Sequence, residues 1–450
     1  MKKAAFYTLG CKVNQYETEA MAELFADSGY EIKEFNEVAD VYVINTCSVT
    51  NMGDRKSRQI IRRAKKLNPN AVIAVTGCYA QTAPDEVLAI EGVNLVLGTK
   101  DRKNIVTLVE EINTESNINH VSDIMSNHEF EELQIKQYSN RTRAFIKIQE
   151  GCNQFCSYCI IPYARGRVRS RKPEDVEAEV KGLVARGYRE VVLTGIHLSS
   201  YGTEHMEGSP VKGGDWDSGP LWDLIERIHR VEGLERIRLG SLEPRIITRE
   251  FAEKLAGLPE FCPHFHLSLQ SGCDATLKRM NRHYTTEDYL RRCGILREIF
   301  DHPAITTDVI AGFPGETEEE FEETRSFLET VRFYEMHVFK YSKRQGTRAA
   351  VMEDQVSEQV KARRSDVLLE LEKTMSREYR ERFAGSRVSV LFEEAAEIGG
   401  KWYMMGHTPQ YVKAALPLED GMNREEFGGR IMELFASGLL NDEMLKVEFS

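Results

Sequence analysis

Short apolar runs that alternate with helical stretches constrain this chain most, because that pattern requires parallel sheets covered by helices. The runs before residue 114 fall at 4–9, 41–45, 72–76 and 95–97, with helical patterns at 14–28, 54–67 and 84–91. From residue 144 further runs follow at 145–148, 191–193, 237–239, 265–269, 307–310 and 336–339. We therefore expect a parallel α/β domain followed by a partial (β/α)6 barrel.

The 450 residues are too many for one ordinary core, and the pattern suggests three domains. We expect an α/β domain over 1–113, a polar linker over 114–141, a barrel domain with a trailing charged helix over 142–384, and a small all-β barrel over 385–450. Gly385 would end the long helix. No run approaches the ~20 apolar residues of a membrane span, and no signal peptide is recognisable, so we expect a cytoplasmic protein.

Three of the nine cysteines, Cys152, Cys156 and Cys159, follow the first strand of the expected barrel. In a cytoplasmic chain such spacing indicates metal or redox chemistry rather than disulfides. Three thiolates on one tight loop can ligate three irons of a [4Fe–4S] cube and leave the fourth iron open to a small molecule. A zinc site would want a fourth ligand nearby, and three cysteines within eight residues are unusual for a buried core.

A second trio, Cys11, Cys47 and Cys78, consists of cysteines that each follow an apolar strand of the first domain. The carboxyl ends of parallel strands lie at one edge of a sheet, so these thiols can converge on a second cluster. Three unrelated buried cysteines are the alternative, because cysteine is often buried. The remaining three, Cys262, Cys273 and Cys293, match no ligand position and are expected to be ordinary barrel residues.

The loop from Cys152 to Cys159 resembles that of the radical S-adenosylmethionine superfamily, with Tyr158 just before the third cysteine. The runs Thr194-Gly195, 266–272 and 308–316 match it further. The resemblance implies that S-adenosylmethionine chelates the open iron and that reduction of the cluster cleaves it to a 5′-deoxyadenosyl radical. It also implies cofactor contacts from Tyr158, Thr194, Gly195, Ser268, Gln270 and Ile310.

Essentially the whole chain resembles the methylthiotransferase family. The matching segments are Leu9-Gly10-Cys11, Asn45-Thr46-Cys47, Thr76-Gly77-Cys78 and a tail similar to the TRAM barrel, an OB-like RNA-binding module. The resemblance implies a second [4Fe–4S] cluster, on Cys11, Cys47 and Cys78, that carries or donates sulfur. It implies two uses of S-adenosylmethionine, for the methyl group and for the radical, and it requires an external electron donor and a sulfur source.

The substrate prediction depends on the basic run after the first cluster, which contains Arg165, Arg167 and Arg169. This run resembles the branch that converts N6-threonylcarbamoyladenosine, beside the anticodon of tRNA, to its 2-methylthio derivative. Isopentenyladenosine in tRNA and an aspartate of a ribosomal protein are the alternative substrates within the family. We expect the three arginines to pair with RNA phosphates or with the threonyl carboxylate, although a solvated charge run would look similar.

Two further segments bear on RNA binding. Helix 54–67 presents a basic face that includes Arg62 and Arg63, which suits a track for phosphates. The net charge is −12, and residues 386–450 carry 6 basic and 11 acidic residues, so bulk electrostatics cannot attract RNA to the tail. Trp402, Tyr403, His407, Tyr411 and Lys413 could form a local stacking surface, or Trp402 and Tyr411 could belong to the core.

Overall fold

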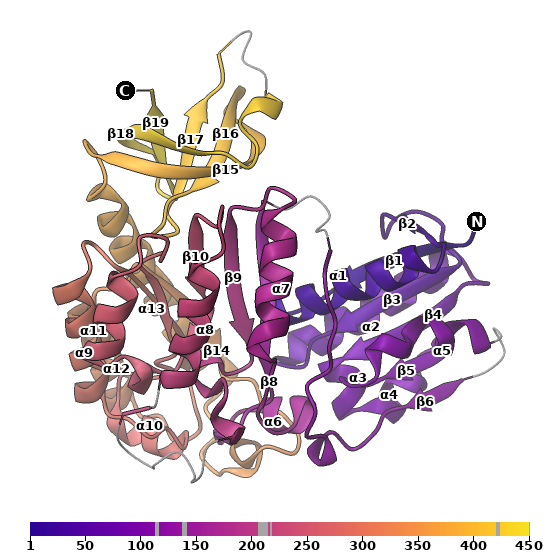
Figure 1. Ribbon diagram of the computed structural model, residues 1–450. Coiled ribbons are helices and arrows are strands. Elements are labelled where there is room, and N and C mark those ends of the chain that lie inside the picture. Colours follow the sequence, from indigo (N-terminus) through magenta and orange to yellow (C-terminus); the bar gives the residue numbers. More distant parts are fainter. Residues whose placement is uncertain (113–116, 137–141, 206–214, 217, 420–423, 450) are drawn as a thin grey trace.

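The computed structural model describes residues 1–112, 117–136, 142–205, 215–216, 218–419 and 424–449 (Figure 1). An α/β unit, a larger strand–helix unit and a small β-barrel follow one another along the chain. Within the described residues, no helix combines the length and the apolar character needed to cross a membrane.

The first unit is built on a parallel sheet with the strand order β2-β1-β3-β4-β5-β6. Its strands are β1 (Lys3–Thr8), β2 (Glu31–Lys33), β3 (Val41–Thr46), β4 (Val72–Gly77), β5 (Leu95–Leu97) and β6 (Ile118–His120). The chain passes from β1 outward to β2 and then returns to the other side of β1 to form β3. Strands β1 and β3 therefore flank a topological switch point, where sheets of this kind bind ligands.

Helices cover both faces of this sheet. On one face lie α1 (Lys12–Asp27) and α5 (Ile105–Glu111), and on the other α2 (Asn51–Leu67), α3 (Cys78–Thr82) and α4 (Pro84–Leu88). Thr50 caps the N-terminus of α2, because its hydroxyl accepts a hydrogen bond from the Gly53 N–H, and the helix buries Ile60, Ile61 and Ala64 against the sheet. The charged side of α2 faces solvent.

The expected linker is partly folded. Strand β6 lies within it and pairs with β5, with Ile118 opposite Leu95. Leu133 and Ile135 are buried in the core of the second unit. The polar composition hid these elements, because a three-residue strand is too short to show a period. Residues 113–116 and 137–141 of this stretch lie outside the described residues.

The second unit contains the six predicted strands of a partial barrel. They are β7 (Arg143–Glu150), β9 (Glu190–Gly195), β10 (Arg236–Leu239), β12 (His264–Leu267), β13 (Ala304–Ala311) and β14 (Glu335–Lys340). The strands form two sheets that a single bridge between Ile237 and Phe261 connects. Two short strands, β8 (Arg169–Ser170) and β11 (Ser241–Leu242), extend them.

The outer side of this barrel packs on helices, and the other side chains face its lumen (Figure 1). The covering helices include α7 (Pro173–Val184), α8 (Gly219–His229), α9 (Arg249–Ala256), α11 (Thr286–Ile299), α12 (Glu318–Val331) and α13 (Glu358–Glu381). Gly385 follows α13 with φ +81°, which glycine adopts without strain. Cys262, Cys273 and Cys293 are all buried here.

The tail forms a closed barrel in the order β15-β16-β17-β19-β18. Its strands are β15 (Arg387–Ile398), β16 (Lys401–His407), β17 (Lys413–Pro417), β18 (Ile431–Asn441) and β19 (Met444–Glu448). Arg236 donates hydrogen bonds to the carbonyls of Ser389 and His407. Arg238 does the same for Thr408 and Pro409, so two lumen arginines of the central barrel hold the tail.

Candidate active site

The first cysteine trio lies on the loop that follows β7. Gly151 begins this loop with φ +74°, and a Cβ there would lie 1.8 Å from the carbonyl oxygen of Arg167, so only glycine fits. The Asn281 amide donates to the carbonyls of Gln154 and Phe155 at 3.3 and 3.2 Å. These contacts hold a tight turn, and all three cysteines of the loop line the neighbouring cavity.

A cavity of about 370 Å³ lies at the mouth of the barrel, where its strands end. Cys152, Cys156 and Cys159 line it on the barrel side, and Cys11 and Val49 line it from the first unit. The two units are joined beside it by Arg344, which pairs with Asp54 at 2.7 Å. The two cysteine-bearing loops therefore face one another across a shared space.

The second trio is grouped as the sheet topology predicts. Cys11, Cys47 and Cys78 follow β1, β3 and β4, which are neighbours in the sheet. A Cβ on Gly10 would lie 3.0 Å from the Cys47 sulfur, so the glycine leaves room for the thiols to converge. Burial, together with the neighbouring Cys78, raises the pKa of Cys47 to about 12.

Both trios have the chemistry that an iron–sulfur cluster requires. Burial and the neighbouring Cys156 raise the pKa of Cys152 to about 12, so the positive charge of a bound metal would favour ionisation of this thiol. One arginine donates to each trio: Arg282 Nη1 lies 3.3 Å from the Cys156 sulfur, and Arg165 Nε lies 3.3 Å from the Cys78 sulfur. Such hydrogen bonds tune a cluster and orient its ligands.

Five of the six predicted cofactor contacts line the cavity, namely Tyr158, Gly195, Ser268, Gln270 and Ile310. Thr194 is buried next to Gly195 and is not among the lining residues. Sequence reasoning missed other lining residues, which are His197, Glu243, Arg282, Asp308 and Lys340. Position at the end of a barrel strand was the available signal for His197, Glu243 and Lys340, because barrel active sites form there, whereas Arg282 follows α10 (Asp274–Arg279) and Asp308 lies within β13.

His197 shows that the cavity is built for a polar guest. Its Nδ1 lies 2.7 Å from the Ser200 hydroxyl, and its buried Nε2 has no hydrogen-bond partner within the described part of the chain. Burial, together with the charges of Arg282 and Arg245, lowers the pKa of this imidazole to about 3. The ring is therefore neutral and can donate to or accept from a bound molecule such as S-adenosylmethionine.

The prediction that Arg165 and Arg169 bind RNA is wrong. Both side chains are buried, and Arg165 Nη1 lies 2.5 Å from Glu17 and 2.7 Å from Glu150. Arg169 donates to backbone carbonyls and lies 3.7 Å from Glu150. Both guanidinium groups are thus bound inside the protein, and within the described residues Arg169 Nε is the one of their nitrogens that is buried without a hydrogen-bond partner. Only Arg167 is exposed, with its guanidinium 4.7 Å from the centre of the Phe155 ring.

Arg165 belongs to an ion network that lies between the first two units. Arg102 and Lys147 also contact Glu17, at 2.5 and 3.1 Å. Burial alone would raise the pKa of Glu17, but the three cations lower it to about 2. This carboxylate therefore stays ionised, and the network holds α1 against β7.

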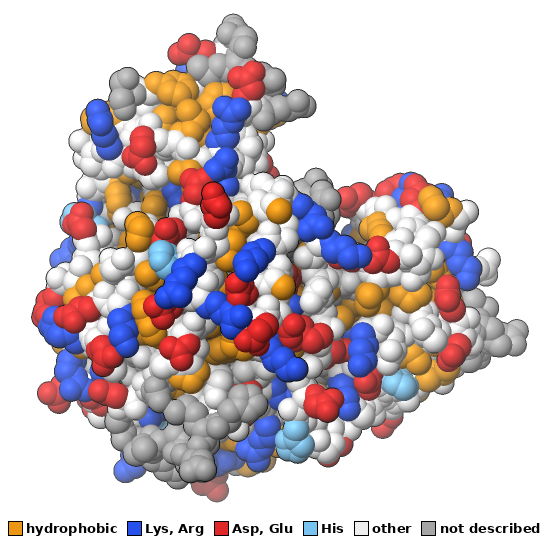
Figure 2. Space-filling view, in the orientation of Figure 1, with side chains coloured by type: hydrophobic (Ala, Val, Ile, Leu, Met, Phe, Trp, Pro, Cys, Tyr) orange, Lys and Arg blue, Asp and Glu red, His pale blue; other side chains and the backbone are white. Residues whose placement is uncertain are grey.

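The other predicted RNA contacts have different environments. Arg62 and Arg63 are exposed on α2, and Trp402 is 40% exposed with the Arg424 guanidinium 3.6 Å from its ring centre. Tyr411 instead lies between Arg143 and Arg238 of the central barrel, each 4.7 Å from its ring. On the face shown in Figure 2, basic and acidic side chains are interspersed, without one continuous basic surface.

Comparison with known proteins agrees with this site. A model described as the Radical SAM superfamily matches residues 146–328, and one described as Uncharacterized protein family UPF0004 matches residues 3–98. The radical S-adenosylmethionine methyltransferase TsrM from Kitasatospora setae has a similar fold, with TM-score 0.54 and 16% identity over 78% of this chain and 77% of that one. The fold and the site define a radical S-adenosylmethionine enzyme, a class that uses a [4Fe–4S] cluster.

Curated relatives narrow the class. The threonylcarbamoyladenosine tRNA methylthiotransferase MtaB of Bacillus subtilis is 49% identical over 92% of this chain and 90% of its own length. MtaB of Aquifex aeolicus is 40% identical over 87% and 93%. A tRNA-2-methylthio-N(6)-dimethylallyladenosine synthase of Clostridium botulinum is 36% identical over 86% and 85%. The chain belongs to the MtaB family of radical S-adenosylmethionine methylthiotransferases.

We predict that Arg165→Met destabilises the junction between the first two units. The change leaves Glu17 and Glu150 with one cation fewer and removes the donor to Cys78, which should cost about 3 kcal/mol. Thermal unfolding of the anaerobically reconstituted protein measures the loss. Arg167→Met, two residues away and exposed, is the matched control. Equal unfolding temperatures for the two variants would contradict a structural role for the network.

Proposed function

We propose that this enzyme inserts a methylthio group at carbon 2 of N6-threonylcarbamoyladenosine in tRNA. The observation that carries the proposal is the shared cavity, in which Cys11 faces Cys152, Cys156 and Cys159. A base held there would lie between the radical-generating site and the second trio. The relatives named for threonylcarbamoyladenosine, at 49% and 40% identity, support this choice of substrate.

A second [4Fe–4S] cluster, on Cys11, Cys47 and Cys78, forms part of the proposal. The grouped thiols, the space beside Gly10 and the Arg165 donor all support it. A cluster held by Cys152, Cys156 and Cys159 would supply the one-electron reduction that cleaves S-adenosylmethionine to methionine and a radical able to remove an unactivated hydrogen, chemistry that no side chain offers. Tyr158, Gly195, Ser268, Gln270 and Ile310 would hold that cofactor, and the second trio would present the sulfur.

The proposed macromolecular partner is tRNA, and an external electron donor and a sulfur source complete the reaction. The exposed Arg62 and Arg63 of α2 are our proposed contacts to its phosphates, with Arg167 near the cavity. The acidic tail contributes less through electrostatics, since basic side chains dominate phosphate binding.

Removal of either cysteine trio should lower the iron content, and the two variants should separate formation of 5′-deoxyadenosine from formation of the methylthio product. We expect about eight irons in the reconstituted wild type and about four in each triple Cys→Ala variant. The variant lacking Cys11, Cys47 and Cys78 should still form 5′-deoxyadenosine but no methylthio product. The variant lacking the other trio should do neither, and Cys273→Ala, a buried cysteine elsewhere, should match the wild type. Full iron in either triple variant would refute the ligand assignment.

The substrate is tested with two tRNA pools in an anaerobic assay. We expect product from tRNA that carries N6-threonylcarbamoyladenosine and little from tRNA that carries isopentenyladenosine, because the two groups differ in charge and polarity. Mass spectrometry of the nucleosides identifies the products. Equal or better conversion of the isopentenyl pool would overturn the substrate assignment while leaving the radical chemistry intact. Methylthiolation of a ribosomal protein would favour the alternative in which an aspartate is the substrate.

The double variant Arg62→Ala, Arg63→Ala should weaken tRNA binding and lower the slope of log K against log salt by about two. Binding titrations at several salt concentrations give this slope. Arg230→Ala, an exposed arginine at the end of α8, serves as control and should leave it unchanged. An unchanged slope in the double variant would remove α2 from the proposed interface.

A further inference from the structure

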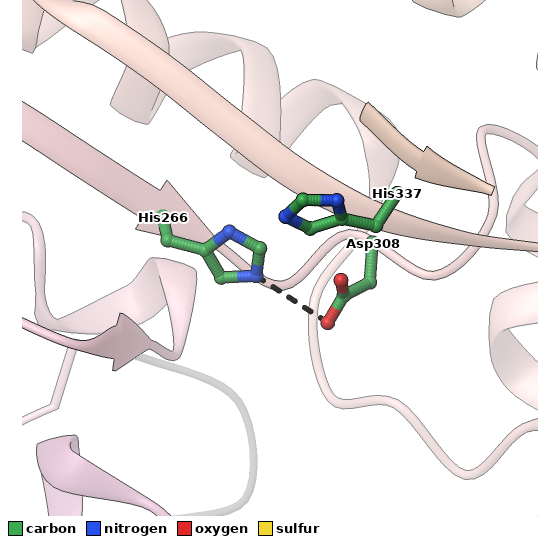
Figure 3. A group of neighbouring side chains, drawn as sticks. All are labelled: His266, Asp308 and His337. Atoms are coloured by element: carbon green, nitrogen blue, oxygen red, sulfur yellow. Dashed lines mark ion pairs between the residues drawn. The ribbon is translucent and has the colours of Figure 1, made fainter. Parts of the chain in front are cut away.

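Three ionisable side chains in the lumen of the barrel have no part in the assignments above. His266, Asp308 and His337 come from the adjacent strands β12, β13 and β14 and point toward one another (Figure 3). His266 Nε2 lies 3.3 Å from an Asp308 oxygen, and one polar atom from each residue lies within 4.8 Å of the others. The Thr306 hydroxyl, 3.0 Å from His266 Nδ1, orients that ring.

Strand register places this trio directly beneath the cavity. Asp308 pairs with His337, and two residues further along Ile310 pairs with Phe339. Side chains two residues apart share a face of a strand. Ser268, Ile310 and Phe339 all line the cavity, and so does Asp308 itself. The trio is therefore the next layer of side chains into the lumen, at the floor of the cavity.

The trio is also accessible from the open side of the barrel. Strand β14 ends the sheet order, so its outer edge has no neighbouring strand within that sheet. His337 is exposed, and Phe339 above it is 41% exposed although it borders the cavity. An exposed aromatic ring at a cavity is a surface on which a base can stack. A base on Phe339 would have its substituents within reach of the layer below.

Deeper in the lumen, two arginines are paired with glutamates and, in the part of the chain that the structure describes, one lysine is not. Arg238 pairs with Glu190, and Arg143 with Glu393. Lys12 completes this group, with its ammonium 5.7 Å from the Phe145 ring centre. Within the described residues no carboxylate lies within ion-pair distance of that ammonium. A cation without an acidic partner favours the entry of an anionic group.

We propose that His266, Asp308 and His337 bind the polar N6 substituent of the substrate adenosine and so select it. The inference rests on the proposed function. A threonylcarbamoyl group offers N–H and hydroxyl donors to Asp308, and a carboxylate and a carbonyl to the His337 imidazole, while His266, held by Asp308 and Thr306, keeps the Asp308 carboxylate in place. An isopentenyl group offers neither, so on its binding the second Asp308 oxygen and the His337 ring would lose water without gaining a partner, which a polar site rejects strongly. This assignment takes the place of Arg165, whose guanidinium is buried among glutamates.

The test is His337→Phe in the reconstituted holoenzyme, assayed with tRNA that carries threonylcarbamoyladenosine, isopentenyladenosine or unmodified adenosine. We expect KM for the first substrate to rise about tenfold or more. The kcat/KM ratio of threonylcarbamoyl to isopentenyl substrate should fall by a similar factor. Iron content and formation of 5′-deoxyadenosine without tRNA should stay at the wild-type level. Asp308→Asn should shift the ratio in the same direction, and His120→Phe, an exposed histidine on β6, should change nothing.

The other outcomes of this experiment distinguish a failure of the inference from a failure of the proposed function. Wild-type selectivity in both His337→Phe and Asp308→Asn would overturn the inference while leaving the proposed function intact. A wild-type enzyme with no preference for the threonylcarbamoyl substrate would overturn the proposed function instead. One zinc or manganese ion per chain that both variants lose would identify the trio as a metal site, and would overturn its role as a direct reader of the substituent.

Discussion

The buried ion network around Glu17 and Glu150 is the constraint on which the rest of the structure depends. Charges taken out of water are tolerated only when they are closely paired, so this network fixes its members in place. Glu150 directly precedes the loop of the first cysteine trio, and Arg165 contacts the sulfur of Cys78 in the second. The pairing therefore sets how the two cysteine-bearing loops face each other across the cavity.

The fold followed from local patterns. The barrel strands coincide with apolar runs, because alternation of strand and helix is recorded in neighbouring residues. The two trios were also visible, since Cys11, Cys47, Cys78 and Cys152 each follow a strand closely and Cys156 and Cys159 lie on the same loop as Cys152. The burial of Arg165 could not be read in this way. Its partner Glu17 lies 148 residues away, and a basic run has the same composition whether it is solvated or buried.

The polar residues of the lumen escaped sequence reasoning for a related reason. His266 and Asp308 lie in strands whose alternate side chains pack outward on helices, and nothing in the sequence distinguishes a polar residue on the inner face of such a strand as a binding residue. Their meeting with His337 depends on the register of three strands, which only the fold supplies. The position of Tyr411 could not be predicted either. An aromatic ring suits stacking on RNA and packing between two arginines equally well, and the structure shows the second.

The way the tail barrel is attached has a consequence for how the sequences of such chains can evolve. Arg236 and Arg238 bind mainly carbonyl oxygens of the backbone, at Ser389, His407, Thr408 and Pro409. Every amino acid supplies a carbonyl, so this attachment depends on the path of the tail and little on its side chains. Substitutions can thus make the surface of the small barrel acidic, or adapt it to a different macromolecule, while its attachment to the central unit stays the same.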